Sequence, residues 1–118
     1  MEKTIRIGEQ EVAFKATAST ARRYRQQFGR DLLVDINKAL PNARKGTLGE
    51  GEVEIFENLA YIMARQADDT VSGDPEEWLD QFEPFDMITA LNEIVTLWGA
   101  NSQTLESPKK KGGQRSAR

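Results

Sequence analysis

The sequence predicts a mainly α domain of the α+β class, in which an N-terminal β-hairpin precedes four to five helices and a disordered basic tail. Two changes of pattern carry this prediction. Apolar and polar residues alternate over residues 3–16, whereas apolar residues recur at helical spacing over residues 17–101. No such spacing continues into residues 104–118. A chain of 118 residues fits one domain, so we expect a single globular domain over residues 1–103.

The hairpin is predicted from two short alternating runs. Ile5 and Ile7 alternate with polar residues, and Val12 and Phe14 do the same further along. Gly8–Gln10 between the runs is a short turn that contains a glycine. A lone hairpin is only marginally stable, so we expect its single apolar face to rest on the helices.

Two short helices are predicted next. Thr17 or Ser19 is the N-cap of the first, and Gly29 suits its C-terminal end. Asp31 caps the second helix, and Pro41 is expected to end it. The apolar positions are Ala21, Tyr24 and Phe28 in the first helix and Leu32 or Leu33, Ile36 and Leu40 in the second.

A glycine-containing loop is expected at residues 42–51, and residues 52–69 after it form the strongest helical pattern of the chain. An apolar sector as broad as this one is typical of a central helix that packs on more than one side. The first stripe holds Val53, Phe56, Ala60, Met63 and Ala67, and the second holds Ile55, Leu59 and Ile62.

Two more helices are predicted in the last third. Asp74 is an N-cap, Pro75 takes the first helical position, and Glu77 completes a capping box. Pro84 breaks this helix or begins the next one, which is expected to stop at Gly99. The apolar residues are Trp78, Leu79 and Phe82 in the first of these helices, and Phe85, Ile88, Leu91, Val95 and Trp98 along one face of the second.

The composition excludes several kinds of chemistry. The chain has no cysteine and no histidine, which removes disulfides, the commonest zinc ligands and the usual general base near neutral pH. It also has no phosphate-binding glycine loop and no nucleophile-elbow motif. The N-terminus lacks a signal-peptide stretch and no apolar run is long enough to span a membrane, so a soluble intracellular protein is expected.

Two clusters of carboxylates could in principle bind magnesium or share a proton. Their spacing instead places them at helix N-termini, where the helix dipole favours negative charge. We therefore predict no catalytic, metal-binding or cofactor-binding residue. The clusters are Glu50, Glu52, Glu54 and Glu57, and Asp74, Glu76, Glu77 and Asp80.

A basic patch in the first helical region has two interpretations. Arg22, Arg23, Arg25 and Arg30 could contact nucleic acid, or they could form a solvated face that balances the acidic part of the chain. The net charge is −3, but residues 104–118 hold five basic residues against one acidic residue and carry +4, which leaves −7 for the rest. An acidic domain repels nucleic acid, so the second interpretation is favoured. A helix-turn-helix within this region would have an acidic and therefore poor recognition helix.

Four aromatic residues concentrate in the last third of the chain: Trp78, Phe82, Phe85 and Trp98. Such residues usually form core. Because Pro84 places Phe82 and Phe85 near a bend, a surface that binds a partner is the alternative.

The order of these segments resembles one family. A hairpin segment KTIRIGEQEVAFKATAST leads into ARRYRQQFGRDLL, then into EIFENLAYIMARQADD and WLDQFEPFDMITALNEIVTLWGANSQT, and the chain closes with PKKK. This resembles the tail assembly chaperones of long-tailed bacteriophages and prophages, in the form found with Gram-positive hosts. The resemblance covers roughly residues 3–111, and it rests on the order of the elements and on phrases such as YRQQFGRDLL, not on catalytic residues.

The resemblance implies a non-enzymatic role in virion morphogenesis. Such chaperones coat the tape measure protein and help to recruit major tail protein subunits around it. They act in the cytoplasm of the bacterial host and leave before the virion is complete. A homo-oligomer without cofactor, nucleic acid, membrane or small-molecule substrate is implied. The alternatives are a small acidic helical regulator that binds another protein and, less favoured, a nucleic-acid-binding module that uses Arg22, Arg23 and Arg25.

The resemblance also suggests an origin for the basic tail. Many such chaperones exist in two forms, because programmed frameshifting near the end of the gene appends a second domain to a minority of the product. Lysine codons are rich in adenine, so Lys109, Lys110 and Lys111 could mark a slippery run, with residues 114–118 as the zero-frame remainder. The alternative is that the tail binds an acidic surface, including the acidic domain of a neighbouring copy.

Overall fold

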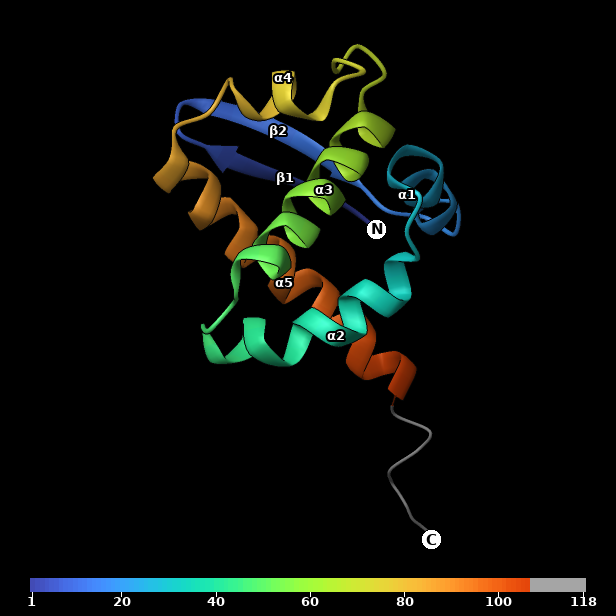
Figure 1. Cartoon of the computed structure of the whole chain (residues 1–118). Coiled ribbons are helices and arrows are strands. Elements are labelled where there is room, and N and C mark those ends of the chain that lie inside the picture. The colour runs from blue at the N-terminus through green and yellow to red at the C-terminus, as the bar shows by residue number, and fades with distance from the viewer. Residues whose placement is uncertain (107–118) are drawn as a thin grey trace, which may run out of the picture.

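The computed structural model describes residues 1–106, apart from the side chains of Glu50 and of residues 99–106. Over this range the chain forms an antiparallel hairpin followed by five helices, which confirms the predicted fold class. The predicted lysine-rich tail, with Lys109, Lys110 and Lys111, lies outside the described residues. In chain order the elements are β1 (Glu2–Ile7), β2 (Gln10–Lys15), α1 (Thr20–Phe28), α2 (Leu32–Lys45), α3 (Glu50–Ala67), α4 (Pro75–Leu79) and α5 (Pro84–Glu106) (Figure 1).

The hairpin has the single apolar face that its alternation predicts. Ile5, Ile7 and Phe14 are buried on that face, and Val12 beside them is half-buried. Gly8 opens the tight turn with a φ of +64°, which suits glycine because it has no Cβ. A Cβ at this position would also lie 2.7 Å from the Oδ2 atom of Asp86 at the start of α5.

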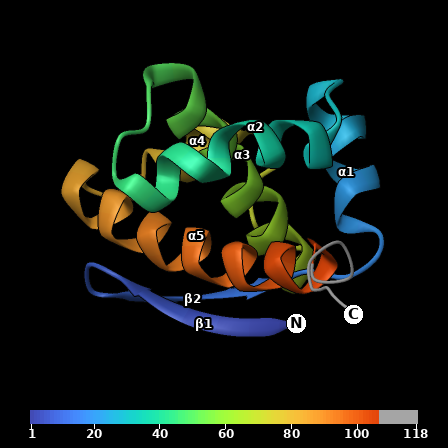
Figure 2. The same cartoon turned by 90° about the horizontal axis from the view of Figure 1, so that it is seen from below.

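Helix α3 is the centre of the fold, as its two apolar stripes predict. It contacts β2, α1, α2, α4 and α5, and its residues from Leu59 to Ala64 are all buried. Helix α5 packs on β1, α2 and α3. Figure 2 shows the hairpin on one side of α5 and α2 on the other side. The apolar face of the hairpin is therefore covered by α3 and α5.

Helix α2 does not end at Pro41, where the sequence predicted its end. It continues to Lys45, so the loop predicted at residues 42–51 shrinks to residues 46–49. Proline within a helix removes one hydrogen bond but does not forbid the next turn. The end is set instead by Gly46, which has a φ of +73° and donates its N–H to the Ala43 carbonyl, while Thr47 donates to Asn42 at 2.9 Å.

The predicted cap of α1 differs in detail from the structure. Ser19 is at the N-cap, but its side chain makes no capping hydrogen bond. The hydroxyl of Thr20, which is buried, accepts from the Thr17 N–H and donates to the side chain of Gln66 on α3. Packing against α3 therefore takes precedence over a conventional cap.

The capping box predicted at α4 is wrong in one half. Asp74 caps the helix by accepting from the Glu76 N–H at 3.0 Å, as predicted. Glu77, however, accepts from the Ser72 hydroxyl, and Ser72 in turn accepts from the Asp74 N–H at 3.1 Å. Because Ser72 lies between the two groups, the reciprocal bond of the box does not form.

Helix α5 starts at Pro84, which confirms that this proline begins a helix. The predicted stop at Gly99 is wrong, because the helix continues to Glu106. Glycine within a helix costs about 1 kcal/mol, which is too little to end a helix by itself. The predicted apolar face is also partly wrong. The buried face of α5 consists of Met87, Ala90, Leu91 and Ile94, whereas Phe85 and Ile88 are exposed.

Candidate protein-binding surface

Trp78, the first of the four candidate aromatic residues, belongs to the core. It is buried and makes edge-to-face contacts with Phe14, Tyr61 and Phe82, with ring centroids 6.5, 5.9 and 5.2 Å apart. These contacts join α4 to the hairpin and to α3. Trp78 therefore holds the short helix α4 in place and is not available to a partner.

Phe82 and Trp98 are intermediate cases. Phe82 is half-buried and lines a depression of about 250 Å³ between β2 and the segment that connects α3 to α4. Trp98 is half-buried against α3, where its indole N–H donates to the Met63 sulfur at 3.2 Å. Both side chains are anchored by the fold and keep only part of their surface open.

Phe85 is the candidate that is exposed. Its side chain lies in the first turn of α5 and is 82% exposed, and Ile88 one turn later is 52% exposed. We call these two residues the α5 apolar surface. Their helix is anchored on both sides, because Asp86 lies against the hairpin turn at Gly8 and Met87 is buried. The surface is thus small, apolar and carried by a rigid element.

A second exposed apolar pair lies on the first turn of α2. Leu33 is 51% exposed and Val34 is 62% exposed, while Leu32 between them and the N-cap is buried. The sequence pattern allows either Leu32 or Leu33 to face the core, and in the structure Leu32 does so. Three consecutive apolar residues cannot all face one side of a helix, which is the signal that predicts exposure of at least one of them.

The buried polar group that the sequence analysis missed is Asp35 on α2. Its carboxylate accepts from the Tyr24 hydroxyl at 3.0 Å and from Arg30 Nε and a terminal guanidinium nitrogen at 2.8 and 2.7 Å. The bond to Arg30 is the main cause that holds the pKa of Asp35 below its ordinary value. Burial and the bond to Asp35 raise the pKa of Tyr24. This network ties α1 to α2.

The basic patch is partly neutralised within the fold. Arg30 is paired with Asp35, Arg25 lies 3.7 Å from the Asp31 carboxylate, and Arg23 Nε donates to the Ser19 hydroxyl at 3.1 Å. Arg22 is exposed. These contacts support the interpretation of the basic patch as a solvated face of the fold.

The first carboxylate cluster supports the junction between α2 and α3. Glu52 accepts from the Gly49 N–H at 2.9 Å and from the Asn42 side-chain amide at 3.0 Å, and these two bonds lower the pKa of its carboxyl. The pKa of Glu57 is raised, chiefly because it is partly buried and also because Glu54 is close. Over the part of the chain that the structure describes, no group of three or more acidic side chains could hold a metal ion.

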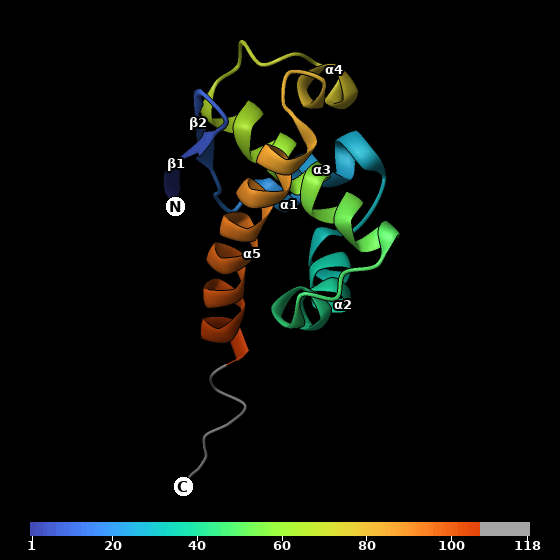
Figure 3. The same ribbon diagram turned by 90° about the vertical axis from the view of Figure 1, so that its left-hand side faces the viewer.

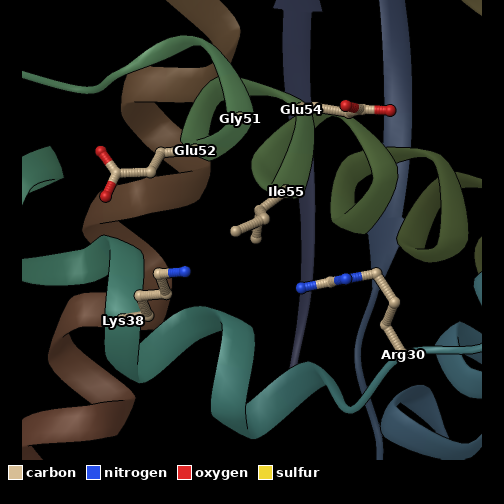
Figure 4. A pocket seen from close by; sticks show the side chains of 6 residues that line it. All are labelled: Arg30, Lys38, Gly51, Glu52, Glu54 and Ile55. Carbon is tan, nitrogen blue, oxygen red and sulfur yellow. The ribbon is translucent and has the colours of Figure 1, made fainter.

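A depression of about 440 Å³ lies beside this junction. Figure 4 shows Lys38 on α2 and Arg30 just before that helix on one side, with Glu52 and Glu54 of α3 on the other. Ile55 lies between them. The mixed charges give this depression no preference for an anion or a cation.

None of the helices within residues 1–106 is both long and apolar enough to cross a membrane. Comparisons with protein-family models, with curated proteins and with solved structures found no match to this chain.

Proposed function

We propose that this protein is a non-enzymatic tail assembly chaperone of a long-tailed bacteriophage or prophage. Its partners would be the tape measure protein, which it keeps from aggregating, and the major tail protein subunits that assemble around it. The sequence resemblance suggests this role. The structural observation that carries it is the exposure of Phe85 and Ile88 on the anchored first turns of α5.

Exposed apolar side chains on a rigid helix suit a chaperone because they can pair with apolar helical segments of a client without chemistry. Burying an exposed side chain of the size of Phe85 contributes about 1.5–3 kcal/mol, and Ile88, which is 52% exposed, contributes less. That is too little to hold a client permanently, and release before virion completion requires such weak contacts. Several copies along one long client would add their contacts and increase the avidity of the complex.

Co-expression tests this proposal. A tape measure protein of a long-tailed phage is expressed alone, with the wild-type protein, and with a variant that carries Phe85→Ser and Ile88→Ser. We expect the wild type to raise the soluble fraction of the tape measure protein severalfold and the variant to lose most of that gain. The matched control carries Leu33→Ser and Val34→Ser, which removes two exposed apolar side chains from α2 and should keep the gain.

Two results would count against the proposal. A wild-type protein that leaves the tape measure protein insoluble would remove the chaperone role. A double α5 variant that rescues as well as the wild type would separate the role from the α5 apolar surface. A stable one-to-one complex with a different small protein would instead favour the regulator.

The proposed location and the longer product have tests of their own. A chaperone that leaves during assembly should be abundant in infected or induced cells and absent from purified virions, which mass spectrometry can measure. The native gene with its downstream DNA should also yield a minor longer product that diverges within residues 108–113. A single product would remove the frameshift hypothesis for Lys109–Lys111, and the basic tail would then need a binding partner.

A further inference from the structure

Strand β1 is paired on one side only. At the open end of the hairpin, Met1 and Ala16 exchange both backbone hydrogen bonds, at 3.0 and 2.9 Å. In an antiparallel ladder, every second residue exchanges bonds with the same neighbour. Lys3, Ile5 and Ile7 therefore direct their backbone groups toward β2, in agreement with the register that opposes Ile5 to Val12.

The residues between them direct their N–H and C=O groups away from β2. These are Glu2, Thr4 and Arg6, whose side chains are exposed. Within the described residues, none of the three makes a backbone hydrogen bond outside the hairpin. Figures 2 and 3 show β1 along the outside of the molecule with no other labelled element beyond it. Strand β2 differs, because the segment at residues 68–72 faces it across the depression that Phe82 lines.

We propose that β1 pairs with β1 of a second copy of this chain, antiparallel and around a two-fold axis at Thr4. The two hairpins then form one four-stranded sheet. Glu2 of each copy lies opposite Arg6 of the other copy, and the two Thr4 residues face each other. An unpaired strand edge is a template for such pairing, and opposite charges directly across a strand pair stabilise it.

The charges select this register. Outward-directed backbone groups can bond only when Glu2, Thr4 and Arg6 of one copy face the same set in the other copy. The antiparallel register centred on Thr4 aligns all three and forms two Glu2–Arg6 pairs. A shift by two residues aligns only two positions and opposes a charge to Thr4. In-register parallel pairing brings like charges together, which is unfavourable.

The side chains near this edge permit the pairing. The contact that Arg6 makes within the chain is weak, since its nearest partner, Glu11, is 3.9 Å away and the two side chains are 65% and 71% exposed. On the inner face, Lys3 would lie opposite Ile5 of the other copy. Ile5 is already buried within its own chain, and the flexible aliphatic stem of Lys3 lets its ammonium group stay in solvent.

This pairing stands apart from the proposed function, because it follows from the strand edge and requires no client. Its test is charge reversal, measured by sedimentation velocity over a range of protein concentrations. Glu2→Arg alone gives two Arg–Arg contacts across the axis, and Arg6→Glu alone gives two Glu–Glu contacts. Each single variant should raise the dimer Kd by on the order of tenfold or more.

Two combinations should restore the dimer. The chain that carries Glu2→Arg and Arg6→Glu together has both pairs reversed and should associate like the wild type. An equal mixture of the two single variants should form a heterodimer, since one chain then supplies two arginines and the other two glutamates. The matched control is Glu11→Arg, which breaks the same Arg6–Glu11 contact on the other strand and should leave association unchanged.

Circular dichroism of every variant establishes that it is folded, and a cysteine crosslink gives a second measurement that needs no charge change. The chain has no cysteine, so Thr4→Cys introduces one thiol that should form an intermolecular disulfide on mild oxidation. Ala13→Cys on the outer edge of β2 should not. A monomeric wild type at millimolar concentration, unchanged association in both single variants, or equal crosslinking at both cysteine positions would overturn the proposal.

Discussion

Replacing Tyr24 by Phe removes one hydroxyl group from a buried contact between α1 and α2. Tyr24 is fully buried, and Asp35, which accepts its hydrogen bond, is 2% exposed. A hydrogen bond to a charged group contributes about 1.5–3 kcal/mol. Asp35 keeps its two bonds to Arg30, so we expect the lower part of that range, about 1.5 kcal/mol, for Tyr24→Phe.

Replacing Asp35 by Ala should cost more. This variant leaves the Tyr24 hydroxyl buried without its acceptor, at about 1–3 kcal/mol. It also removes the partner of Arg30, but that side chain is 58% exposed and can be hydrated instead. We therefore expect a cost in the upper part of that range, about 3 kcal/mol. In the double variant the hydroxyl and its acceptor are both gone, so its cost should fall short of the sum by about 1.5 kcal/mol.

Urea denaturation at pH 7, followed by far-UV circular dichroism, measures these values. With a slope near 1.5 kcal/mol per molar urea, Tyr24→Phe should lower the midpoint by about 1 M. Tyr61→Phe is the matched control, because the Tyr61 hydroxyl donates to the neutral Ser72 carbonyl at 2.7 Å and its loss should cost less. A Tyr24→Phe cost below about 0.5 kcal/mol, or strict additivity with Asp35→Ala, would refute the role assigned to this contact.

Three further predictions concern pH and helix packing. The pKa of Asp35 is lower in the folded chain than its ordinary value near 4, so its carboxylate stabilises the fold above that value. This stability is lost as pH falls through the folded pKa, and acid titration should therefore destabilise the wild type more steeply than Asp35→Asn. Equal slopes would contradict this. The pKa of Glu57 is raised, so its contribution is full below its ordinary value and is lost as pH rises through the folded value. Glu57→Gln should therefore raise the thermal midpoint at pH 7 and give no gain near pH 4, and a gain at both pH values would point to another cause. Pro41→Ala should stabilise α2 by about 1 kcal/mol in urea titrations, because it restores an N–H within the helix, whereas Pro75→Ala at the first position of α4 should give no gain.

The parts of the fold that follow from local pattern were predictable. Alternation over a few residues specifies the apolar face of a hairpin, so the positions of Ile5, Ile7 and Phe14 in the sequence are enough to assign them to the core. The cap at Asp31 follows in the same way, since its side chain bonds to the Val34 N–H of its own helix. In each case the residues that form the pattern are close in the sequence.

Other features could not be predicted because distant contacts decide them. Whether a helix continues past Pro41 depends on what its next turn contacts, and Asn42 donates to Glu52 at the start of α3. The network around Asp35 could not be read from the sequence either, because Tyr24 and Arg30 reach it from another helix and from the connecting segment. Asp35 looked like an ordinary acidic residue in the first turn of a helix, where the dipole alone explains its presence.

The exposure of Phe85 follows from the orientation of α5 about its own helix axis. Successive residues of a helix are separated by about 100° around its axis. Asp86 lies against Gly8 in the hairpin turn, and Met87 is buried in the core. Around the axis Phe85 lies about 100° from Asp86 and about 160° from Met87, and Ile88 lies only about 60° from Phe85.

Burying Phe85 would require a rotation of α5 that removes Asp86 from the hairpin turn and carries Met87 out of the core. The packing that stabilises the domain therefore also holds the α5 apolar surface open. This has a consequence for the co-expression experiment. Serine at positions 85 and 88 leaves Asp86 at the hairpin turn and Met87 in the core, so we expect the variant to keep the circular dichroism spectrum of the wild type. With that spectrum unchanged, a loss of rescue reports on client binding and not on folding.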